Sequence, residues 1–254
     1  MSAGRDPLEA SVPAQLRFLE EAQARFLTLL AGWPRAGETD GRASPPLPRL
    51  DQDFFCPLDA LCAYAMIRTR RPRRLVEIGG GHSSRILARA RADAGLSDPH
   101  DVIDPVPARG VDRLAAAGAV RLHAVPVEEA SRDLWRALAP GDCVFVDGAH
   151  RSGPGRDVDF VFGTLLPALP AGVLVHVHDI FLPDAYPAAF AARGYDEQIR
   201  VAQALAHGRL RCTLATHVLS TRMAGHPVLA AVAALAPSRA PPASLWALTA
   251  PAHS

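Results

Sequence analysis

The amino-acid sequence predicts an α/β protein built on one doubly wound, mostly parallel sheet. Short apolar runs of strand length recur along the chain and are separated by segments with helical periodicity. This alternation is typical of parallel strands joined by right-handed helical crossovers. Several of the apolar runs end in an acidic residue, which places polar side chains at the sheet edge where such folds bind ligands.

The strongest local pattern is the segment 75–89, which reads LVEIGGGHSSRILAR. An apolar run ends near a carboxylate, three glycines follow, and apolar residues then recur at helical spacing. The segment therefore predicts a strand, a tight turn and a helix. Glycines in such a turn let the backbone approach a ligand closely, and the helix N-terminus offers free N–H groups and a partial positive charge.

Two classes of cofactor use a turn of this kind. The dinucleotide pattern G-x-G-x-x-G/A requires glycine or alanine where this chain has Ser84. The alternative pattern, acid-x-Gly-x-Gly-x-small, is met by Glu77, Gly79, Gly81 and Ser83. The turn therefore favours S-adenosylmethionine over NAD, with a purely structural turn as the remaining alternative.

Composition disfavours several classes of partner. The chain has 254 residues, 49% of them hydrophobic, which is enough for one α/β core and an extension. Its net charge is +1, with acidic and basic residues spread evenly, so we expect neither nucleic acid nor a membrane surface as partner. The four cysteines lack C-x-x-C spacing, and no signal peptide or membrane-spanning run is evident, so we expect a soluble cytoplasmic protein with reduced thiols.

The chain is expected to divide into an N-terminal extension, residues 1–53, and a cofactor-binding domain, residues 54–254. Apolar residues recur at near-helical spacing over 13–31, which predicts an amphipathic helix, and a Pro-rich linker follows over 33–50. The helix belongs to no strand–crossover unit. We therefore expect it to lie over the cofactor mouth or to pack against a second subunit of a homodimer.

The second domain is predicted to alternate helices and strands. A helix from residue 57 to about residue 67 leads into the strand 75–78. Further strands are predicted at 102–104, 120–123, 143–147, 173–178, 211–219 and 245–249. Helices are predicted at 111–117, 127–138, 157–169 and 196–207, with a short helix and a turn within 230–242.

Ionisable residues mark the ends of four predicted strands: Glu77, Asp104, Asp147 and the pair His178-Asp179. A carboxylate about 20 residues after a glycine turn can accept hydrogen bonds from both ribose hydroxyls, and we assign this role to Asp104. An Asx-type turn before the next proline is the alternative for that residue.

Four segments around these residues carry a resemblance to a known family. They are EIGGGHS at 77–83, VIDP at 102–105, VFVDGAH at 144–150, and VHVHDIFLP at 175–183 with the Tyr-Pro pair at 186–187. They resemble the class I S-adenosylmethionine-dependent methyltransferases, and in particular bacterial small-molecule methyltransferases with D-G-x-H and H-D-I-F-x-P motifs. The resemblance covers about residues 54–249 and is specific for class and cofactor, not for the methyl acceptor.

This resemblance implies a Rossmann-like seven-stranded sheet whose last strand, 244–249, is inserted antiparallel beside the fifth. It also implies a set of cofactor-binding residues: Glu77, Gly79, Gly81 and Ser83 at the methionine part, Asp104 at the ribose, Glu128 at the adenine, and Asp147 beside them. For Glu128, a carboxylate in the first turn of a helix is an equal alternative.

A catalytic group is implied by more distant relatives, the metal-dependent catechol-type O-methyltransferases. They place an Asp after the fourth strand, a lysine base three residues later, and an acidic pair after the fifth strand. This chain has Asp147, then His150, then His178-Asp179, and no lysine at all. The resemblance implies His150 as the base, since histidine accepts a proton near neutral pH. A histidine at a helix start that bonds a nearby carboxylate is the alternative. Asp147, His178 and Asp179 could hold a divalent cation (Mg, Mn, Fe or Zn), or His178 could hydrogen-bond the substrate without a metal.

We therefore expect an S-adenosylmethionine-dependent methyltransferase that acts on a small molecule, with an oxygen acceptor preferred. An NAD(P)-dependent oxidoreductase and a non-catalytic cofactor-binding protein with the same fold are the alternatives. Ser84 argues against the first, and the ionisable residues at the strand ends argue against the second. His176, deeper in its strand than His178, is expected to be a core residue.

Overall fold

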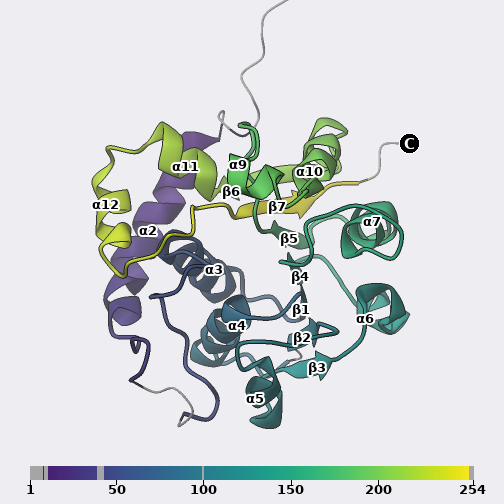
Figure 1. Ribbon diagram of the computed structural model, residues 1–254, viewed down its shortest axis with the longest axis horizontal. Coiled ribbons are helices and arrows are strands. Elements are labelled where there is room, and N and C mark those ends of the chain that lie inside the picture. Colours follow the sequence, from purple (N-terminus) through teal and green to yellow (C-terminus); the bar gives the residue numbers. More distant parts are fainter. Residues whose placement is uncertain (1–7, 9–10, 39–42, 99, 252–254) are drawn as a thin grey trace, which may run out of the picture.

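A seven-stranded sheet forms the centre of the computed structural model, which describes residues 8, 11–38, 43–98 and 100–251 (Figure 1). Its strands are β1 (Leu75–Ile78), β2 (His100–Ile103), β3 (Arg121–His123), β4 (Cys143–Val146), β5 (Leu174–Val177), β6 (Leu210–Ala215) and β7 (Leu245–Thr249). Their order is β3-β2-β1-β4-β5-β7-β6. β1 to β5 pair in parallel, and β7 is antiparallel to both β5 and β6. The predicted fold class is confirmed.

The strand order has a switch point between β1 and β4. From β1 the chain winds outward through β2 to β3, and from β4 it winds in the opposite direction through β5. The last residues of β1, β4 and β5 lie in register, so Gly79, Asp147 and His178 leave the sheet at the same level. In open parallel sheets this is the place where ligands bind.

Helices cover both faces of the sheet (Figure 1). They are α2 (Val12–Ala31), α3 (Pro57–Arg70), α4 (His82–Asp93), α5 (Val111–Ala116), η1 (Val127–Glu129), α6 (Arg132–Arg136), α7 (Asp157–Phe160), η2 (Val161–Leu165), α8 (Leu166–Ala168), α9 (Ala188–Ala191), α10 (Glu197–Ala206), α11 (Thr216–Arg222) and α12 (Pro227–Ala233). Successive strand residues such as Phe145 and Val146 belong to different apolar clusters. The sheet is therefore buried on both faces, as expected for a parallel sheet.

Two predicted elements differ in the structure. The helix predicted at 127–138 is split into η1 and α6, because Ala130 is extended and Ser131 begins α6, its side chain accepting a hydrogen bond from the backbone N–H of Asp133 at 3.3 Å. The strand predicted at 211–219 ends at Ala215, and α11 follows. Thr216 turns the chain there, because its hydroxyl donates to the buried Asp59 at 2.5 Å. Local β propensity is overridden by this long-range contact.

The N-terminal helix is part of the core and does not lie over the cofactor mouth. α2 packs against α3, α11 and α12, and its residues Leu19, Phe26 and Leu30 share one apolar cluster with residues of β1 and β4. The buried Gln15 accepts a hydrogen bond from the backbone N–H of Ala215 at 2.7 Å. No residue of α2 lines either cavity of the site described below. In the described residues α2 thus packs on the core, away from both cavities. The boundary after residue 53 and a contact of α2 with a second subunit stay predictions; residues 1–7, 9–10 and 39–42 lie outside the described part.

Cysteine environment and helix length complete the description of the fold. Cys56, Cys62 and Cys143 are buried, and Cys212 is partly exposed. Within the described residues, no helix combines the length and the apolar character needed to cross a bilayer.

The packing of α2 predicts a specific stability effect. Phe26 is 5% exposed and its ring meets the edge of Tyr64 at 5.2 Å between centroids, so Phe26→Ala should lower the free energy of unfolding by about 3 kcal/mol. Leu29 lies on the same helix but is 38% exposed, so Leu29→Ala should cost about 0.5 kcal/mol. Urea unfolding measures both. Equal, small losses in the two variants would show that α2 is a detachable extension.

Candidate active site

The glycine turn after β1 touches the turn after β4. Gly79 has a φ of +82°, and a Cβ atom built there would lie 2.0 Å from the carbonyl oxygen of Asp147. Glycine is therefore required both by the backbone conformation and by the close approach. This contact brings Asp147 against the glycine turn at the switch point of the sheet.

Glu77 lies beneath the glycine turn. Its side chain is fully buried, with Oε1 accepting a hydrogen bond from the Ser83 hydroxyl at 2.7 Å and Oε2 lying 3.0 Å from His100 Nε2. Glu77 lines neither cavity of the site, whereas Gly79, Gly81 and Ser83 do. Glu77 therefore supports the turn through Ser83, and its expected role at the methionine part of a cofactor stays a prediction.

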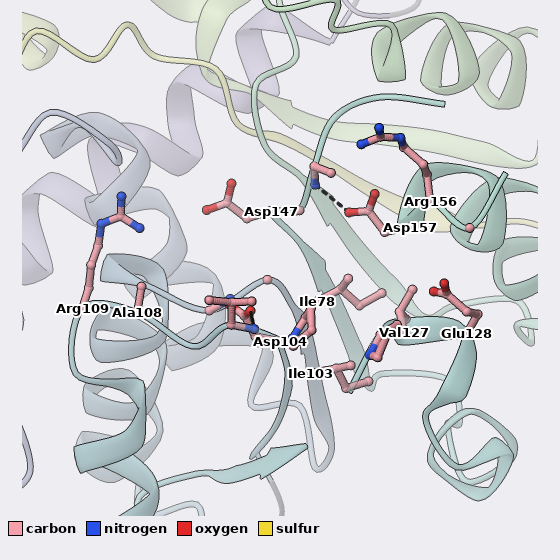
Figure 2. Close-up of a pocket in the computed structure, with 18 residues that line it drawn as sticks. Ile78, Ile103, Asp104, Ala108, Arg109, Val127, Glu128, Asp147, Arg156 and Asp157 are labelled. Atoms are coloured by element: carbon pink, nitrogen blue, oxygen red, sulfur yellow. Dashed lines mark hydrogen bonds between the residues drawn. The ribbon is translucent and has the colours of Figure 1, made fainter. Parts of the chain in front are cut away.

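One cavity of about 400 Å³, here called the Asp104 cavity, opens between the ends of β1, β2 and β4 (Figure 2). Asp104 Oδ2 accepts a hydrogen bond from the N–H of Gly80, and Oδ1 accepts one from the N–H of Val106, both at 2.8 Å. The second bond is the Asx-type turn considered above. Each carboxylate oxygen keeps a further lone pair, so Asp104 can still accept hydrogen bonds from a ligand.

The far end of the Asp104 cavity is formed by η1 and the start of α7. Figure 2 shows Val127 and Glu128 on one side and Arg156 and Asp157 on the other. Asp157 Oδ2 accepts a hydrogen bond from the N–H of Ala149 at 2.7 Å. Glu128 therefore lies at the cavity that contains Asp104, on the opposite side from the glycine turn.

A second cavity of about 570 Å³, here called the His150 cavity, adjoins the first. Gly80, Arg109, Asp147 and Gly148 line both cavities. The His150 cavity is also lined by the three expected catalytic residues and by aromatic side chains: His150, His178, Asp179, Phe54, Phe190 and Tyr195. A ligand that lies along the glycine turn can therefore reach from one cavity into the other.

Two histidines and two aspartates meet at the floor of the His150 cavity. His150 Nε2 lies 3.6 Å from Asp147 Oδ1 and 3.4 Å from Asp179 Oδ2. His178 Nδ1 lies 3.3 Å from Asp147 Oδ1 and 3.5 Å from Asp179 Oδ1. The structure thus brings together the residues that the sequence placed after the fourth and fifth strands.

Each of these histidines has a second carboxylate behind it. His150 Nδ1 is 2.8 Å from Oε2 of Glu197, and His178 Nε2 is 3.4 Å from Oδ2 of Asp59. Both carboxylates are almost completely buried. The sequence analysis assigned no role to either residue. Both lie within residues 54–249, which the resemblance covers, but outside its motif segments, and Asp59 lies in the first turn of α3.

The buried carboxylates control the charge of the histidines. Burial by itself lowers the pKa of His150, but Asp147, Glu197 and Asp179 outweigh it and hold this pKa well above the usual range. For His178, burial likewise lowers the pKa, and Asp147, Asp179 and Asp59 raise it well above the usual range. The buried carboxylates therefore favour the protonated form of both imidazoles.

The aspartates respond in opposite directions. Burial raises the pKa of Asp147, but its two histidine neighbours outweigh burial and lower this pKa. Burial dominates for Asp179, whose pKa is raised even though His178 and His150 oppose the shift. Two carboxylates at one site with pKa values shifted apart are a feature of acid–base centres.

The backbone is strained at the same place. His150 has a φ of +58°, Asp179 of +55° and Arg109 of +54°, and all three residues line the His150 cavity. A non-glycine residue with such a positive φ costs of the order of 1 kcal/mol, so it persists only where the surroundings hold it.

His176 is a core residue, as expected. It stacks on Phe145, and its Nε2 lies 2.9 Å from the Ser244 hydroxyl.

A divalent cation does not fit this arrangement. Across the described residues, no group of three or more His, Cys, Asp or Glu side chains is arranged to hold a metal ion. Asp147, His178 and Asp179 lie together as expected, and each of the two aspartates pairs with His178.

Comparison with known proteins gives one family match. Residues 76–180, from β1 to the segment after β5, match the model of a family described as a methyltransferase domain. No curated protein matches the chain significantly.

Several solved structures are similar to the chain. The SAH-bound methyltransferase PaMTH1 of Podospora anserina is 19% identical, with 78% of this chain and 81% of that chain covered and a TM-score of 0.44. Cofactor-bound Rv0187 from MTB is 21% identical, with 84% of each chain covered and a TM-score of 0.38. The branched-chain polyamine synthase of Thermus thermophilus is 19% identical, with 90% and 63% covered and a TM-score of 0.43. With TM-scores below 0.5, these likenesses carry no argument about activity.

The charge of His150 can be measured directly. We expect NMR of the ¹⁵N-histidine-labelled protein to show His150 as an imidazolium at pH 7, because Glu197 and the two aspartates raise its pKa. In Glu197→Gln the amide oxygen can still accept the Nδ1 hydrogen bond but carries no charge, so deprotonation should move to lower pH by about 1 unit or more. Glu129→Gln, an exposed carboxylate of η1, is the control. An unchanged titration in Glu197→Gln would contradict the assigned cause.

Proposed function

We propose that this chain, a class I S-adenosylmethionine-dependent methyltransferase by its motifs, its fold and the match of residues 76–180, methylates a hydroxyl oxygen of a small molecule. The observation that carries the proposal is the junction of two cavities at the glycine turn. One cavity has the carboxylates that suit an adenosine, and the other has a cluster of acids and bases. Asp147 lies at their boundary.

The Asp104 cavity is proposed to bind the nucleoside part of the cofactor. Asp104 would accept hydrogen bonds from the ribose hydroxyls through the lone pairs that its backbone contacts leave free. Glu128 at the far end would accept from the adenine amino group, while Ile103 and Val127 supply apolar walls. The glycine turn, with Gly81 and Ser83 on the side of the His150 cavity, would border the methionine part. When bound, the cofactor supplies an electrophilic methyl group.

The His150 cavity is proposed to bind the methyl acceptor. Methyl transfer is an in-line displacement, so the acceptor oxygen must be aligned and its proton removed. His150 Nε2 lies between the carboxylates of Asp147 and Asp179 and is the group we assign as proton acceptor. His150 must first lose its own proton, because its pKa is raised. Activity is therefore expected to rise with pH above neutrality.

His178 and Asp179 are proposed to position the acceptor hydroxyl. Asp179 is partly exposed to the cavity, and its raised pKa lets it share a proton with a hydroxyl. His178 is held from behind by Asp59 and from the side by the ring of Phe55, whose centroid is 4.9 Å away. The cation expected at Asp147, His178 and Asp179 is not part of this proposal, because the arrangement does not fit one.

Cofactor identity is tested by calorimetry on the purified protein. S-adenosylhomocysteine should bind, and NAD should not. Asp104→Ala should weaken binding at least about tenfold, since it removes hydrogen bonds to a charged acceptor. Asp133→Ala, an exposed carboxylate on α6, should bind as the unchanged protein does. Circular dichroism checks that both variants are folded. NAD binding without binding of the sulfur ligand would contradict the proposal.

A further inference from the structure

Three arginines line the His150 cavity, but only one of them is neutralised by an acid. Arg239 pairs with Asp53, with an NH2–Oδ2 distance of 2.7 Å. Arg109 lies over the ring of Phe54, 3.8 Å from the centroid, and Arg193 lies near the ring of Phe190 at 5.2 Å. Within the described part of the chain, neither Arg109 nor Arg193 forms an ion pair with a carboxylate. The cavity therefore holds two arginine cations whose charge is available to a ligand.

A buried histidine lies beside Phe54, the ring under Arg109. His82 lines the cavity and its ring stacks on Phe54, with 5.8 Å between centroids. Its pKa is lowered to about 4, first by burial and then by the nearby charges of Arg85, Arg109 and Arg49. Arginine charge therefore lies close to the wall formed by Phe54 and His82.

The two free arginines differ in position. Arg109 lines both cavities, so it lies where the cofactor passes from one to the other. Arg193 lines only the His150 cavity, on the segment that follows α9. Arg193 is therefore the cation that a methyl acceptor can reach without competing with the cofactor.

Aromatic rings connect Arg193 to the reacting end of the cavity. The guanidinium carbon of Arg193 lies 5.9 Å from the centroid of Tyr195, and the Tyr195 ring lies 4.8 Å from the ring of His150. One aromatic side chain thus spans the distance between the arginine and the assigned base. A planar acceptor lying along Tyr195 would place one end at His150 and the other at Arg193.

We propose that the acceptor is an aromatic hydroxy acid whose hydroxyl lies at His150 and whose carboxylate is bound by Arg193. This inference rests on the proposed function and extends it to a substrate class. Arg193 acts as a specificity residue, since a guanidinium binds a carboxylate through two parallel hydrogen bonds.

The experiment uses the full chain saturated with S-adenosylhomocysteine and measures binding of two acids and their neutral amides by calorimetry. The acids, 4-hydroxybenzoate and 4-hydroxycinnamate, cover two separations of hydroxyl and carboxylate. We expect at least one acid to bind about tenfold more tightly than its amide, and added salt to reduce this preference. Arg193→Gln should abolish the preference while leaving S-adenosylhomocysteine binding unchanged. Arg136→Gln, an exposed arginine on α6, should keep it.

Several outcomes would overturn the inference. Unchanged protein that binds neither acid better than its amide, including protein that binds none of the four compounds, excludes the acid-binding site. A preference that survives Arg193→Gln shows that Arg193 is not its source. Failure of S-adenosylhomocysteine to bind at the first step would instead contradict the proposed function, so the two failures are distinguishable.

Discussion

The site depends on one steric constraint, the contact between the turns that follow β1 and β4. Gly79 approaches the carbonyl of Asp147 so closely that no side chain fits between them. A second close contact lies one residue after Asp147, because a Cβ atom on Gly148 would lie 1.7 Å from the side-chain atom Asp157 Oδ2. Because these backbones touch, the two cavities adjoin at a narrow boundary rather than lying apart. A cofactor that followed the glycine turn would therefore end beside the acid–base cluster.

Two buried carboxylates on helices, Asp59 and Glu197, support the histidines of the site. Asp59 on α3 accepts hydrogen bonds from the Thr216 hydroxyl and from the backbone N–H groups of Ala243 and Ser244, and it faces His178. One fully buried side chain thus connects α3, α11 and the segment before β7 to His178, the residue that follows β5. Burying a charge is costly unless it is hydrogen-bonded and paired, and here it is both. These contacts stabilise the segments that hold the strained backbones of His150 and Asp179.

The sequence predicted those features that follow from local pattern and strand geometry. Strand positions, the glycine turn and the meeting of Asp147, His150, His178 and Asp179 all follow from parallel strands that end at one edge. The place of α2 could not be predicted, because an amphipathic helix shows that it needs a partner surface but not which one. Glu197 and Asp59 could not be assigned either, since a first-turn helical carboxylate looks the same whether it faces solvent or a histidine. The charge of His150 was likewise out of reach, because it depends on three carboxylates that approach from separate segments of the chain.

A crystal structure with S-adenosylhomocysteine bound is the most direct test. It would show whether the cofactor extends from the Asp104 cavity to the cluster of His150 and Asp179. We expect the ribose at Asp104, the adenine beside Glu128, and the sulfur atom at the boundary of the two cavities, facing the cluster of His150 and Asp179. A ligand whose adenine occupied the His150 cavity, or one bound away from the glycine turn, would contradict this arrangement.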